Sequence, residues 1–449
     1  KYWHIDLSGD QFTVHFGRVG SAGQTQTKRF ASAEEAQKAA DKLISEKLRK
    51  GYHETTPPTG EAALGHALEQ AILDAPDDRA SHAAYCDWLQ ERNDPRGEFV
   101  SIHLALENPA LPPEERQRLK SREQELLDAG VWANDWATLC PEEGPEGRGQ
   151  VDFPFTKPLE FVRGLPVRVT FDRLSGAAAT AFVRWPESRF VRELRIGGFD
   201  YEDDDAGRAI LAAWPHLGNL RVFQLGWTSQ EEYGDWCPFQ CHLSGEDVDG
   251  WVRRMPRLEE LYLFADGIPL GSLFGLTNLT RLRVLQVYHN WDYRLDTLAA
   301  NPSLTNLTHL LLHPKALGGW TDTQAYITLE GLQAIAHSPH LRSLKHLRLR
   351  LTRFGDQGIQ VLLESGLLAR LESLDLRHGC VTDEGARLLA TASAAQGLRL
   401  LDLSHNALTE VGIQELKRSG LQLHTAHQHG TVPAPDEDYV DYLHQGDYE

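Results

Sequence analysis

The sequence of 449 residues has little cysteine, no long apolar run and too little positive charge to balance its acids. Five cysteines, an odd number, do not make a disulfide framework, so we expect a reducing, cytoplasmic environment. No apolar run approaches the roughly 18–20 residues that cross a bilayer. A net charge of −19 excludes a protein that coats nucleic acid along its whole length through Lys and Arg.

Motifs of common catalytic and cofactor sites are also missing from the sequence. There is no G-x-x-x-x-G-K-[ST], no H-E-x-x-H, no G-x-S-x-G and no dinucleotide fingerprint. Acidic pairs and single histidines are numerous, but no spacing pairs a nucleophile with a base. We therefore expect no enzymatic activity, no catalytic residue and no cofactor.

A repeated apolar pattern fills the second half of the chain. The pattern apolar-x-x-apolar-x-apolar recurs eight times, beginning at Val191, Leu220, Leu258, Leu282, Leu307, Leu344, Leu371 and Leu398. One strand with three inward apolar residues cannot bury its own face, whereas stacked copies form a solenoid with one core and one long open surface. Such surfaces bind other macromolecules, and the sequence therefore predicts a binding protein.

The two clearest units span residues 371–389 and 398–416, and each predicts a strand, a turn and a short amphipathic helix. Units of about 27 residues with helical outer segments resemble the ribonuclease-inhibitor class of leucine-rich repeat. This resemblance implies a solenoid over residues 186–430, with parallel strands on its concave face and helices on its convex face.

The residues that flank the last apolar position of each strand are expected to point onto the concave face. They are Trp227, Tyr262, Phe264, Tyr288, His289, His313, Arg348, Arg350, Arg377, His378 and His405. Aromatic and arginine anchors are typical of binding patches. The alternative is that some of these aromatics pack against insertions or a neighbouring domain. Because the arginines stand out in an acidic chain, we expect a protein partner with an acidic and aromatic surface.

The last residues, 431–449, form an acidic tail in which Pro-Ala-Pro precedes six Asp/Glu and three Tyr. Its acidic and aromatic content complements the arginine and aromatic residues of the repeats. We hypothesise that the tail folds back over the C-terminal repeats and competes with a partner. The alternative is a solvated tail that adds solubility.

The first 54 residues alternate short strands and turns before a helix that Ser32 and Glu35 cap. The segments Phe16-Gly17-Arg18-Val19-Gly20, Gly23-Gln24-Thr25-Gln26-Thr27-Lys28, Phe30, the helix at 34–48 and Lys50-Gly51-Tyr52 carry the landmarks of one family. This segment resembles the WGR domain, which implies a small β-sheet with one helix packed on it.

The resemblance to the WGR domain implies two kinds of ligand. In poly(ADP-ribose) polymerases the domain binds DNA breaks and docks on neighbouring domains. Phe16 stands at the position of the family's Trp and lacks its indole donor, although a phenyl ring still stacks on a sugar or base. The candidate residues for a DNA end are Phe16, Arg18, Lys28, Lys47 and Arg49, with Lys42 and Lys50 nearby. The alternative is a modest basic surface that docks on protein.

Residues 55–60, with Pro57-Pro58, predict a linker, and residues 61–185 predict a mainly helical domain. The run from Tyr85 to Phe99 and the segment Phe161-Val162-Arg163-Gly164-Leu165-Pro166 resemble the repeat-companion module that precedes bacterial leucine-rich repeats. This resemblance implies closing strands next to the repeats and no activity.

Two groups of potential metal ligands are too sparse to predict a site. Cys237, Cys241 and His242 offer three of the four ligands of a structural zinc ion, and His424, His427 and His429 follow the last repeat. We expect no bound metal.

The sequence therefore predicts a multidomain α/β protein with a WGR domain at 1–54, a helical companion domain and a C-terminal leucine-rich-repeat solenoid. We expect a non-enzymatic sensor or adaptor that binds a protein through the concave face, while the WGR domain docks a DNA end or a protein. One alternative is a DNA-break-binding accessory protein. A second is a regulator of an enzyme, such as an inhibitor or a GTPase activator.

Overall fold

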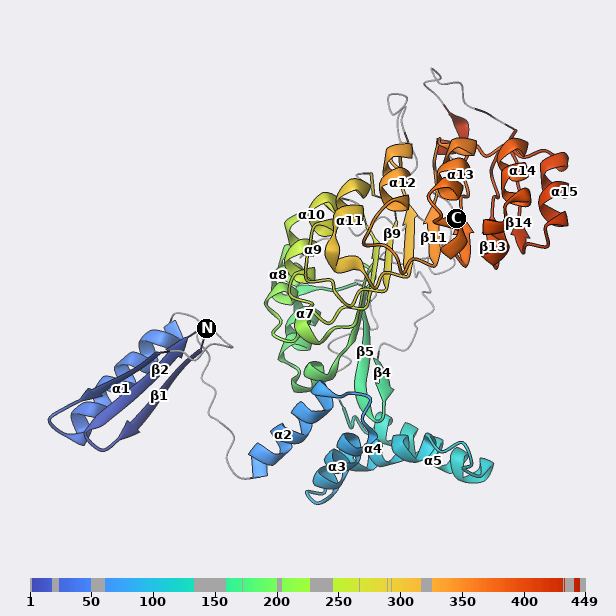
Figure 1. The fold of residues 1–449 in the computed structure, drawn as a ribbon. Coiled ribbons are helices and arrows are strands. Elements are labelled where there is room, and N and C mark those ends of the chain that lie inside the picture. The colour runs from blue at the N-terminus through green and yellow to red at the C-terminus, as the bar shows by residue number, and fades with distance from the viewer. Residues whose placement is uncertain are drawn as a thin grey trace, which may run out of the picture. The chain divides into compact units, whose positions relative to one another are not determined.

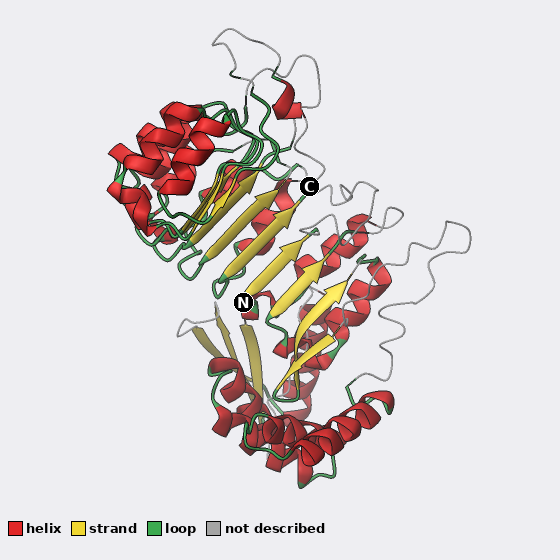
Figure 2. Ribbon diagram, turned by 90° about the vertical axis from the view of Figure 1, so that its right-hand side faces the viewer, coloured by secondary structure: helices red, strands yellow, loops and turns green. Residues whose placement is uncertain are grey.

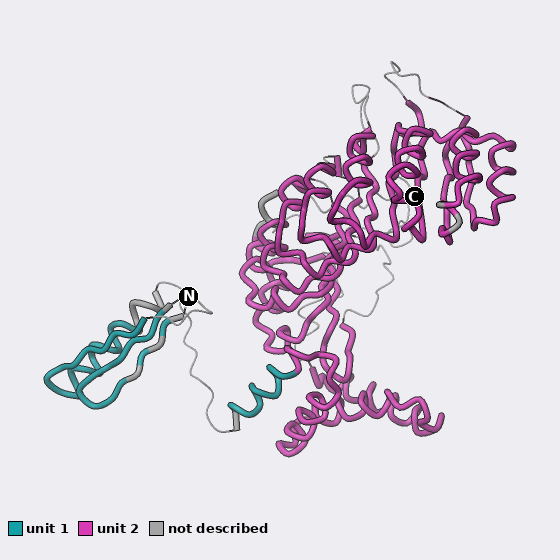
Figure 3. Tube along the Cα trace, in the orientation of Figure 1, with its two compact units in different colours: residues 1–71 teal, residues 72–449 magenta. Residues whose placement is uncertain are grey.

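The computed structural model describes residues 2–17, 24–49, 61–132, 159–171, 173–199, 204–226, 245–265, 267–288, 290–291, 293–315, 325–430, 432 and 440–444. The chain divides into two compact units, residues 1–71 and 72–449 (Figure 3).

The described part of the first unit contains a three-stranded antiparallel sheet, one long helix and most of α2 (Glu61–Asp74), which continues into the second unit. The elements are β1 (Tyr2–Ser8), β2 (Gln11–Gly17), β3 (Gln24–Arg29) and α1 (Ala33–Arg49). Phe12, Val14 and Ala40 form its buried core, and Trp3 packs against them. The predicted cap is confirmed, because the Ser32 hydroxyl accepts from the amide of Glu35 at 3.2 Å.

The second unit is built on one sheet of eleven strands (Figure 1). They are β4 (Leu159–Val162), β5 (Leu165–Phe171), β6 (Glu193–Ile196), β7 (Val222–Leu225), β8 (Glu260–Phe264), β9 (Val284–Tyr288), β10 (His309–His313), β11 (His346–Leu349), β12 (Ser373–Asp375), β13 (Leu400–Asp402) and β14 (Leu423–His424). Spatial order follows chain order, and only the β4–β5 pair is antiparallel. This is the solenoid that the repeats predict.

The eight repeats coincide with eight strands, and each of β6–β13 begins two residues after the start of its pattern. All 24 apolar residues of the eight patterns are buried, with at most 5% of any of them exposed. They belong to one continuous core. The apolar spacing alone therefore fixes which side of every strand faces inward.

Helices cover the other side of this core (Figure 2). They are α7 (Gly176–Arg184), α8 (Asp204–Ala213), α9 (Gly245–Val252), α10 (Leu270–Phe274), α11 (Leu295–Ala300), α12 (Leu329–Ala336), α13 (Gly355–Glu364), α14 (Asp383–Thr391) and α15 (Glu410–Arg418). Short 3-10 helices are η1 (Pro186–Phe190), η2 (Leu217–Asn219), η4 (Pro302–Leu304), η5 (Leu368–Arg370), η6 (Ser393–Gly397) and η7 (Asp441–His444).

An aspartate at the start of one helix ties that helix to the next. Asp356 accepts hydrogen bonds from the amide and hydroxyl of Thr382 at 2.9 and 2.6 Å. One repeat later, Asp383 accepts the same two bonds from Thr409 at 2.8 and 2.5 Å. Each threonine hydroxyl in turn caps the first turn of its own helix. The last helices therefore form a hydrogen-bonded series.

Among the described residues, the helices α2 (Glu61–Asp74), α3 (Arg79–Gln90), α4 (Pro95–Leu106) and α5 (Pro113–Asp128) precede the sheet. Asp78 and Asp94 cap α3 and α4 through their side chains. Phe99 of α4 meets Phe161 of β4 edge to face, with 5.0 Å between ring centroids. Because β5 also pairs with β6, the sheet runs without a break across residue 185, the predicted domain boundary.

Within the described residues, no helix combines the length and the apolar character needed to cross a membrane.

Candidate protein-interaction surface

The central row of the helix-free face is fixed by strand register. It runs Arg195, Gln224, Tyr262, Gln286, Leu311, Arg348, Asp375, Asp402 and His424, one residue from each of β6–β14. Each member on β6–β13 lies between two inward apolar positions, so its side chain points away from the core. The predicted residues Tyr262 and Arg348 belong to this central row.

Three predicted arginines surround two aspartates in the late part of this row. Arg348 Nε lies 2.8 Å from Asp375 Oδ2, and Arg350 Nη2 lies 3.2 Å from the same oxygen. Arg377 Nε lies 3.3 Å from both Asp375 Oδ1 and Asp402 Oδ2. We call these five residues the Arg–Asp cluster. Its three guanidinium groups and two carboxylates leave one net positive charge.

An aromatic row borders the Arg–Asp cluster. Phe264, Tyr288 and His313 are aligned by strand pairing, and their rings meet edge to face at 5.5 and 5.1 Å. Arg348 donates a hydrogen bond to the Tyr288 hydroxyl, and its guanidinium carbon lies 5.8 Å from the Tyr288 ring centroid. The aromatic row and the charged cluster are therefore one connected surface.

Tyr262 lies one step earlier and is half-buried. Its hydroxyl donates to Glu260 Oε2 at 2.8 Å. Burial, together with this bond to Glu260, raises the pKa of Tyr262 and keeps the hydroxyl protonated. It therefore acts as a hydrogen-bond donor.

Three histidines stack at the late end of the face. The rings of His378 and His405 lie 4.3 Å apart, and those of His405 and His427 lie 5.0 Å apart. All three residues have φ between 53° and 55°, the left-handed region. A groove of about 330 Å³ opens beside them, lined by Arg377, Asp402, Ser404, His405, His424, Thr425, Ala426 and His427.

The structure brings most of the predicted concave residues together but buries several of them. Phe264, Tyr288, His313, Arg350 and His378 are at most 7% exposed, because they pack on neighbouring members of the same rows. Tyr262, Arg348, Arg377 and His405 keep partly exposed side chains. Trp227 and His289 lie outside the described residues. The area available to a partner is smaller than the sequence implied, and binding by these residues stays a prediction.

Asp375 and Asp402 are the residues that the sequence reasoning missed. They occupy the same position of the repeat as Arg348, directly before the last apolar residue. The pattern itself could have revealed them, since that position was already assigned to the open face. Their carboxylates neutralise most of the charge on which the expectation of an acidic partner rests.

His309 and His346 form a second stacked pair that was not anticipated. Their rings are 4.0 Å apart, on neighbouring strands. Burial lowers the pKa of both, and the proximity of His346 lowers that of His309 further. Both imidazoles therefore resist protonation, and the pair adds no positive charge near neutral pH.

The predicted DNA-end residues are described only in part. Phe16, on β2, has 36% of its surface exposed, and Lys28 on β3 is exposed. The Lys28 ammonium lies 5.2 Å from the Phe30 ring centroid. Arg18 lies outside the described residues, as do the side chains of Lys47 and Arg49 on α1.

Part of the tail lies against the late repeats. Val440, Tyr442 and Leu443 are buried and pack with Leu351 and Cys380. Folding back of the tail was therefore anticipated correctly for these residues. Tyr442 also donates a hydrogen bond to the Thr352 carbonyl.

The metal candidates do not come together in the described residues, where no three His, Cys, Asp or Glu side chains are grouped as metal ligands. His427 stacks on His405, whereas His429 stacks on Tyr442. Cys237, Cys241 and His242 lie outside the described residues.

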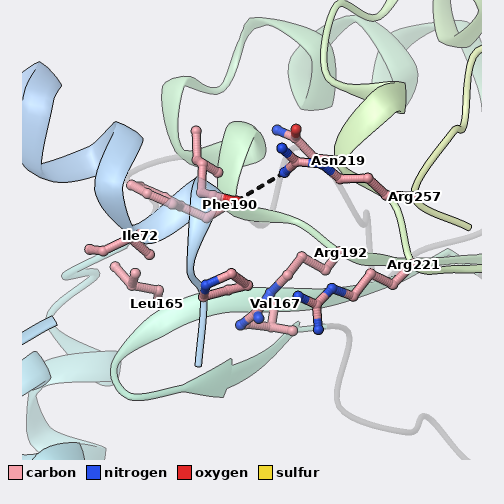
Figure 4. Close-up of a pocket in the computed structure, with 10 residues that line it drawn as sticks. Ile72, Leu165, Val167, Phe190, Arg192, Asn219, Arg221 and Arg257 are labelled. Carbon is pink, nitrogen blue, oxygen red and sulfur yellow. Dashed lines mark hydrogen bonds between the residues drawn. The ribbon is translucent and has the colours of Figure 1, made fainter. Parts of the chain in front are cut away.

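A narrow pocket of about 20 Å³ lies among residues 72–257, at the end of α2 (Figure 4). Ile72, Leu165, Val167 and Phe190 form its apolar wall. Arg257 donates to the Leu73 carbonyl at 2.9 Å. Arg221 and Arg192 approach Asp77 at 3.6 and 3.9 Å. These contacts hold the segment 72–77 to the start of the sheet, and no predicted residue lines the pocket.

The fold and this surface define a leucine-rich-repeat solenoid preceded by a small separate domain. Comparison with protein families agrees: residues 1–59 match the WGR domain, and residues 340–363 and 370–390 match the Leucine Rich repeat family.

Curated relatives match the WGR segment. Over 54 residues, 12% of this chain, the sequence is 50% identical to the uncharacterized protein YfeS and 43% identical to protein YehF, both of Escherichia coli strain K12. The chain spans only about a fifth of these relatives, 22% and 20% of their lengths.

Two solved structures are distantly similar. A Bacteroides fragilis protein aligns over 96% of this chain and 94% of its own, with 19% identity and a TM-score of 0.43. The Listeria monocytogenes internalin InlF aligns over 54% of this chain and 69% of its own, with 20% identity and a TM-score of 0.29. Neither similarity carries an argument about function.

Proposed function

We propose that this chain is a non-enzymatic adaptor that binds a protein partner through the late half of the helix-free face. The observation that carries the proposal is the Arg–Asp cluster beside Tyr288. Arginine and tyrosine are enriched where binding energy concentrates, and here they lie within one connected surface. A partner carboxylate would balance the single excess positive charge, and a partner aromatic ring would extend the aromatic row.

Charge reversal on this face tests the proposal. The double substitution Arg348→Glu and Arg377→Glu should weaken capture of the partner at least about tenfold, because two like charges would then face an acidic surface. The matched control is Arg283→Glu with Arg399→Glu, which makes the same change of charge at residues outside the central row.

Because Arg348→Glu and Arg377→Glu also remove ion pairs with Asp375 and Asp402, capture is compared at a temperature at which circular dichroism shows both double variants to be folded. Equal loss of capture in the two variants would refute the concave face as the binding site and leave only a general charge effect.

A second function, DNA-end binding, is supported by the WGR resemblance and by exposed Phe16 and Lys28. The test is a fluorescence anisotropy titration with nicked, blunt-ended and closed-circular DNA at two salt concentrations. A DNA-end site predicts preference for ends, a steep loss of affinity with salt, and weaker binding after Arg18→Ala. If all three DNAs bind equally or not at all, the WGR domain docks on protein instead.

We further propose that α3–α5 and the β4–β5 hairpin form the repeat-companion module. The Phe99–Phe161 contact and the pairing of β5 with β6 support this role, in which the module closes the first edge of the sheet.

A further inference from the structure

The tail meets the repeats through three buried side chains. Val440, Tyr442 and Leu443 are only 2%, 3% and 1% exposed. They pack with Ala325, Leu351 and Cys380, which come from the turns that follow the strands. We call this place the tail seat. Burial this complete is typical of a bound peptide, whereas a tail in loose contact with a surface keeps its side chains exposed.

Tyr442 makes the most specific contacts in the tail seat. Its hydroxyl donates to the Thr352 carbonyl at 2.9 Å, in the turn after β11. Its ring stacks on His429, with 4.7 Å between centroids and 6° between planes. His429 itself lies 2.9 Å from the Gly379 carbonyl, through Nε2. The seat therefore draws one residue from each of the turns that follow β11, β12 and β14, and it selects a tyrosine.

The backbone of the tail seat is held by the repeats themselves. The amides of Thr352, Gly379 and His429 donate to His378, His405 and Asn406 at 3.2, 3.1 and 2.9 Å. These bonds continue the strand ladder beyond the ends of β11–β13. These three bonds join residues of the repeats only, so we expect the seat to keep its shape when residues 440–443 leave it.

The tether between the seat and its occupant is short, since residues 431–439 separate Gly430 from Val440. A short tether gives the tail an effective concentration in the millimolar range. A free peptide of the same chemistry must compete with the tethered tail for the seat. It therefore binds the full chain only at a concentration high enough to displace the tail.

We infer that the tail seat is a peptide-binding site, and that residues 440–443 are its resident, displaceable intramolecular ligand. The partner segment that fits has an apolar residue, an acid, a tyrosine and a leucine in series, as in Val440-Asp441-Tyr442-Leu443. The tyrosine hydroxyl reaches the Thr352 carbonyl, and the two apolar side chains cover Leu351 and Cys380. This inference rests on the proposed function, because it names a second contact for the protein partner of the repeats.

Cys380 provides a direct readout of the seat. Its side chain is 6% exposed and lies under the tail, while Cys86 is equally buried in α3, far along the chain. With Cys140, Cys237 and Cys241 changed to Ser, a maleimide can react with these two thiols only. Deleting residues 432–449, or changing Tyr442→Ala in the full chain, should speed labelling of Cys380 at least about tenfold and leave Cys86 unchanged.

The probe for binding in trans is a labelled synthetic peptide of residues 436–444. It should bind the truncated chain and restore protection of Cys380, whereas the same peptide with Tyr442→Ala should do neither. Binding to the full chain should be at least about tenfold weaker, because the tethered tail competes. The Arg348→Glu and Arg377→Glu variant should bind the peptide normally, which separates this test from that of the concave face.

Three outcomes would overturn the inference. The first is a truncated chain that does not bind the peptide. The second is a peptide that binds without protecting Cys380. The third is faster labelling of Cys86 as well as Cys380 in both tail variants, which would make the tail a structural cap that the repeats need in order to fold.

Discussion

The early and late repeats share their strands but differ on the helical side. The units that begin at Leu258 and Leu282 have 24 and 25 residues, and their helices α10 and α11 have 5 and 6 residues. The units that begin at Leu344 and Leu371 have 27 residues, and α13 and α14 have 10 and 9. Differences in repeat length are therefore absorbed by the helices, while the strand ladder stays in register.

The same division appears on the open face. In the central row, Arg195 on β6 is followed by the uncharged Gln224, Tyr262 and Gln286, whereas Arg348, Asp375 and Asp402 of the late repeats belong to the Arg–Asp cluster. One architecture thus carries two surface chemistries. The late repeats combine fixed helix-to-helix bonds with a charged surface, which is the arrangement expected of a rigid binding site.

The largest effect should follow a change at the centre of the charged row. Asp375→Asn leaves three guanidinium groups around a neutral amide and should lower the free energy of unfolding by about 3 kcal/mol. Gln224→Ala, at the same position of an early repeat, removes one hydrogen bond to Gly226 and should cost about 1 kcal/mol. Urea unfolding of both variants measures the difference. Equal losses would mean that the charges add nothing to the late repeats.

A smaller effect should distinguish the two kinds of helix junction. A Cβ at Gly412 would lie 2.2 Å from Asp383 Oδ1, so Gly412→Ala should displace this carboxylate from Thr409 and cost about 1–3 kcal/mol. At Gly271 of α10 a Cβ meets Arg294 at an ordinary 3.4 Å. Gly271→Ala should change stability by less than about 1 kcal/mol, and in the favourable direction. A destabilising Gly271→Ala would contradict the expectation that a Cβ fits at this position of α10.

The smallest effect should be a dependence of the stability of the second unit on pH. Burial lowers the pKa of His82, His103, His216, His309 and His346 below the ordinary value of 6.5. As the pH falls below 6.5, the unfolded chain takes up protons that these folded side chains refuse, so stability decreases. Lowering the pH from about 7.5 to 5.5 should therefore reduce the melting temperature of this unit by a few degrees.

One of these histidines can be tested by itself, in the stacked pair of His309 and His346. His346→Gln removes one of the five groups and one ring of the stack with His309. The variant should lose less stability on acidification than the wild type, as differential scanning calorimetry at the two pH values can show. An unchanged pH dependence would exclude His346 as a contributor.

The strands were predictable from sequence because burying three apolar residues at fixed spacing admits one register only. The cap at Ser32 was predictable for a similar reason, since it depends on two residues three apart. The Arg–Asp cluster was not recognised, because three of the ion pairs given above join residues 25 or 27 positions apart and appear only when the strands are placed side by side. The burial of Phe264 and His313 depends on neighbouring rings in the same way.

The tail illustrates a further limit. The hypothesis that the tail returns to the late repeats rested on charge, whereas the contacts now described for Val440, Tyr442 and Leu443 are with Leu351, Cys380, Thr352 and His429. Tyr442 binds Thr352 and His429, and neither residue carries an obvious signal in the sequence. Turn residues become a binding site only because successive turns are stacked by the sheet.

The bonds from Asp356 to Thr382 and from Asp383 to Thr409 each span 26 residues and are interchangeable in kind. Excision of residues 371–397 would place Thr409 where Thr382 stood, with Asp356 ready to accept its bonds, and β13 beside β11 in the existing register. One recombination event can thus remove or add a late unit, and the Asp–Thr hydrogen bonds and the strand pairing at the new junction still form. The length of the late array, and with it the span of partner that it covers, is therefore open to change over evolutionary time.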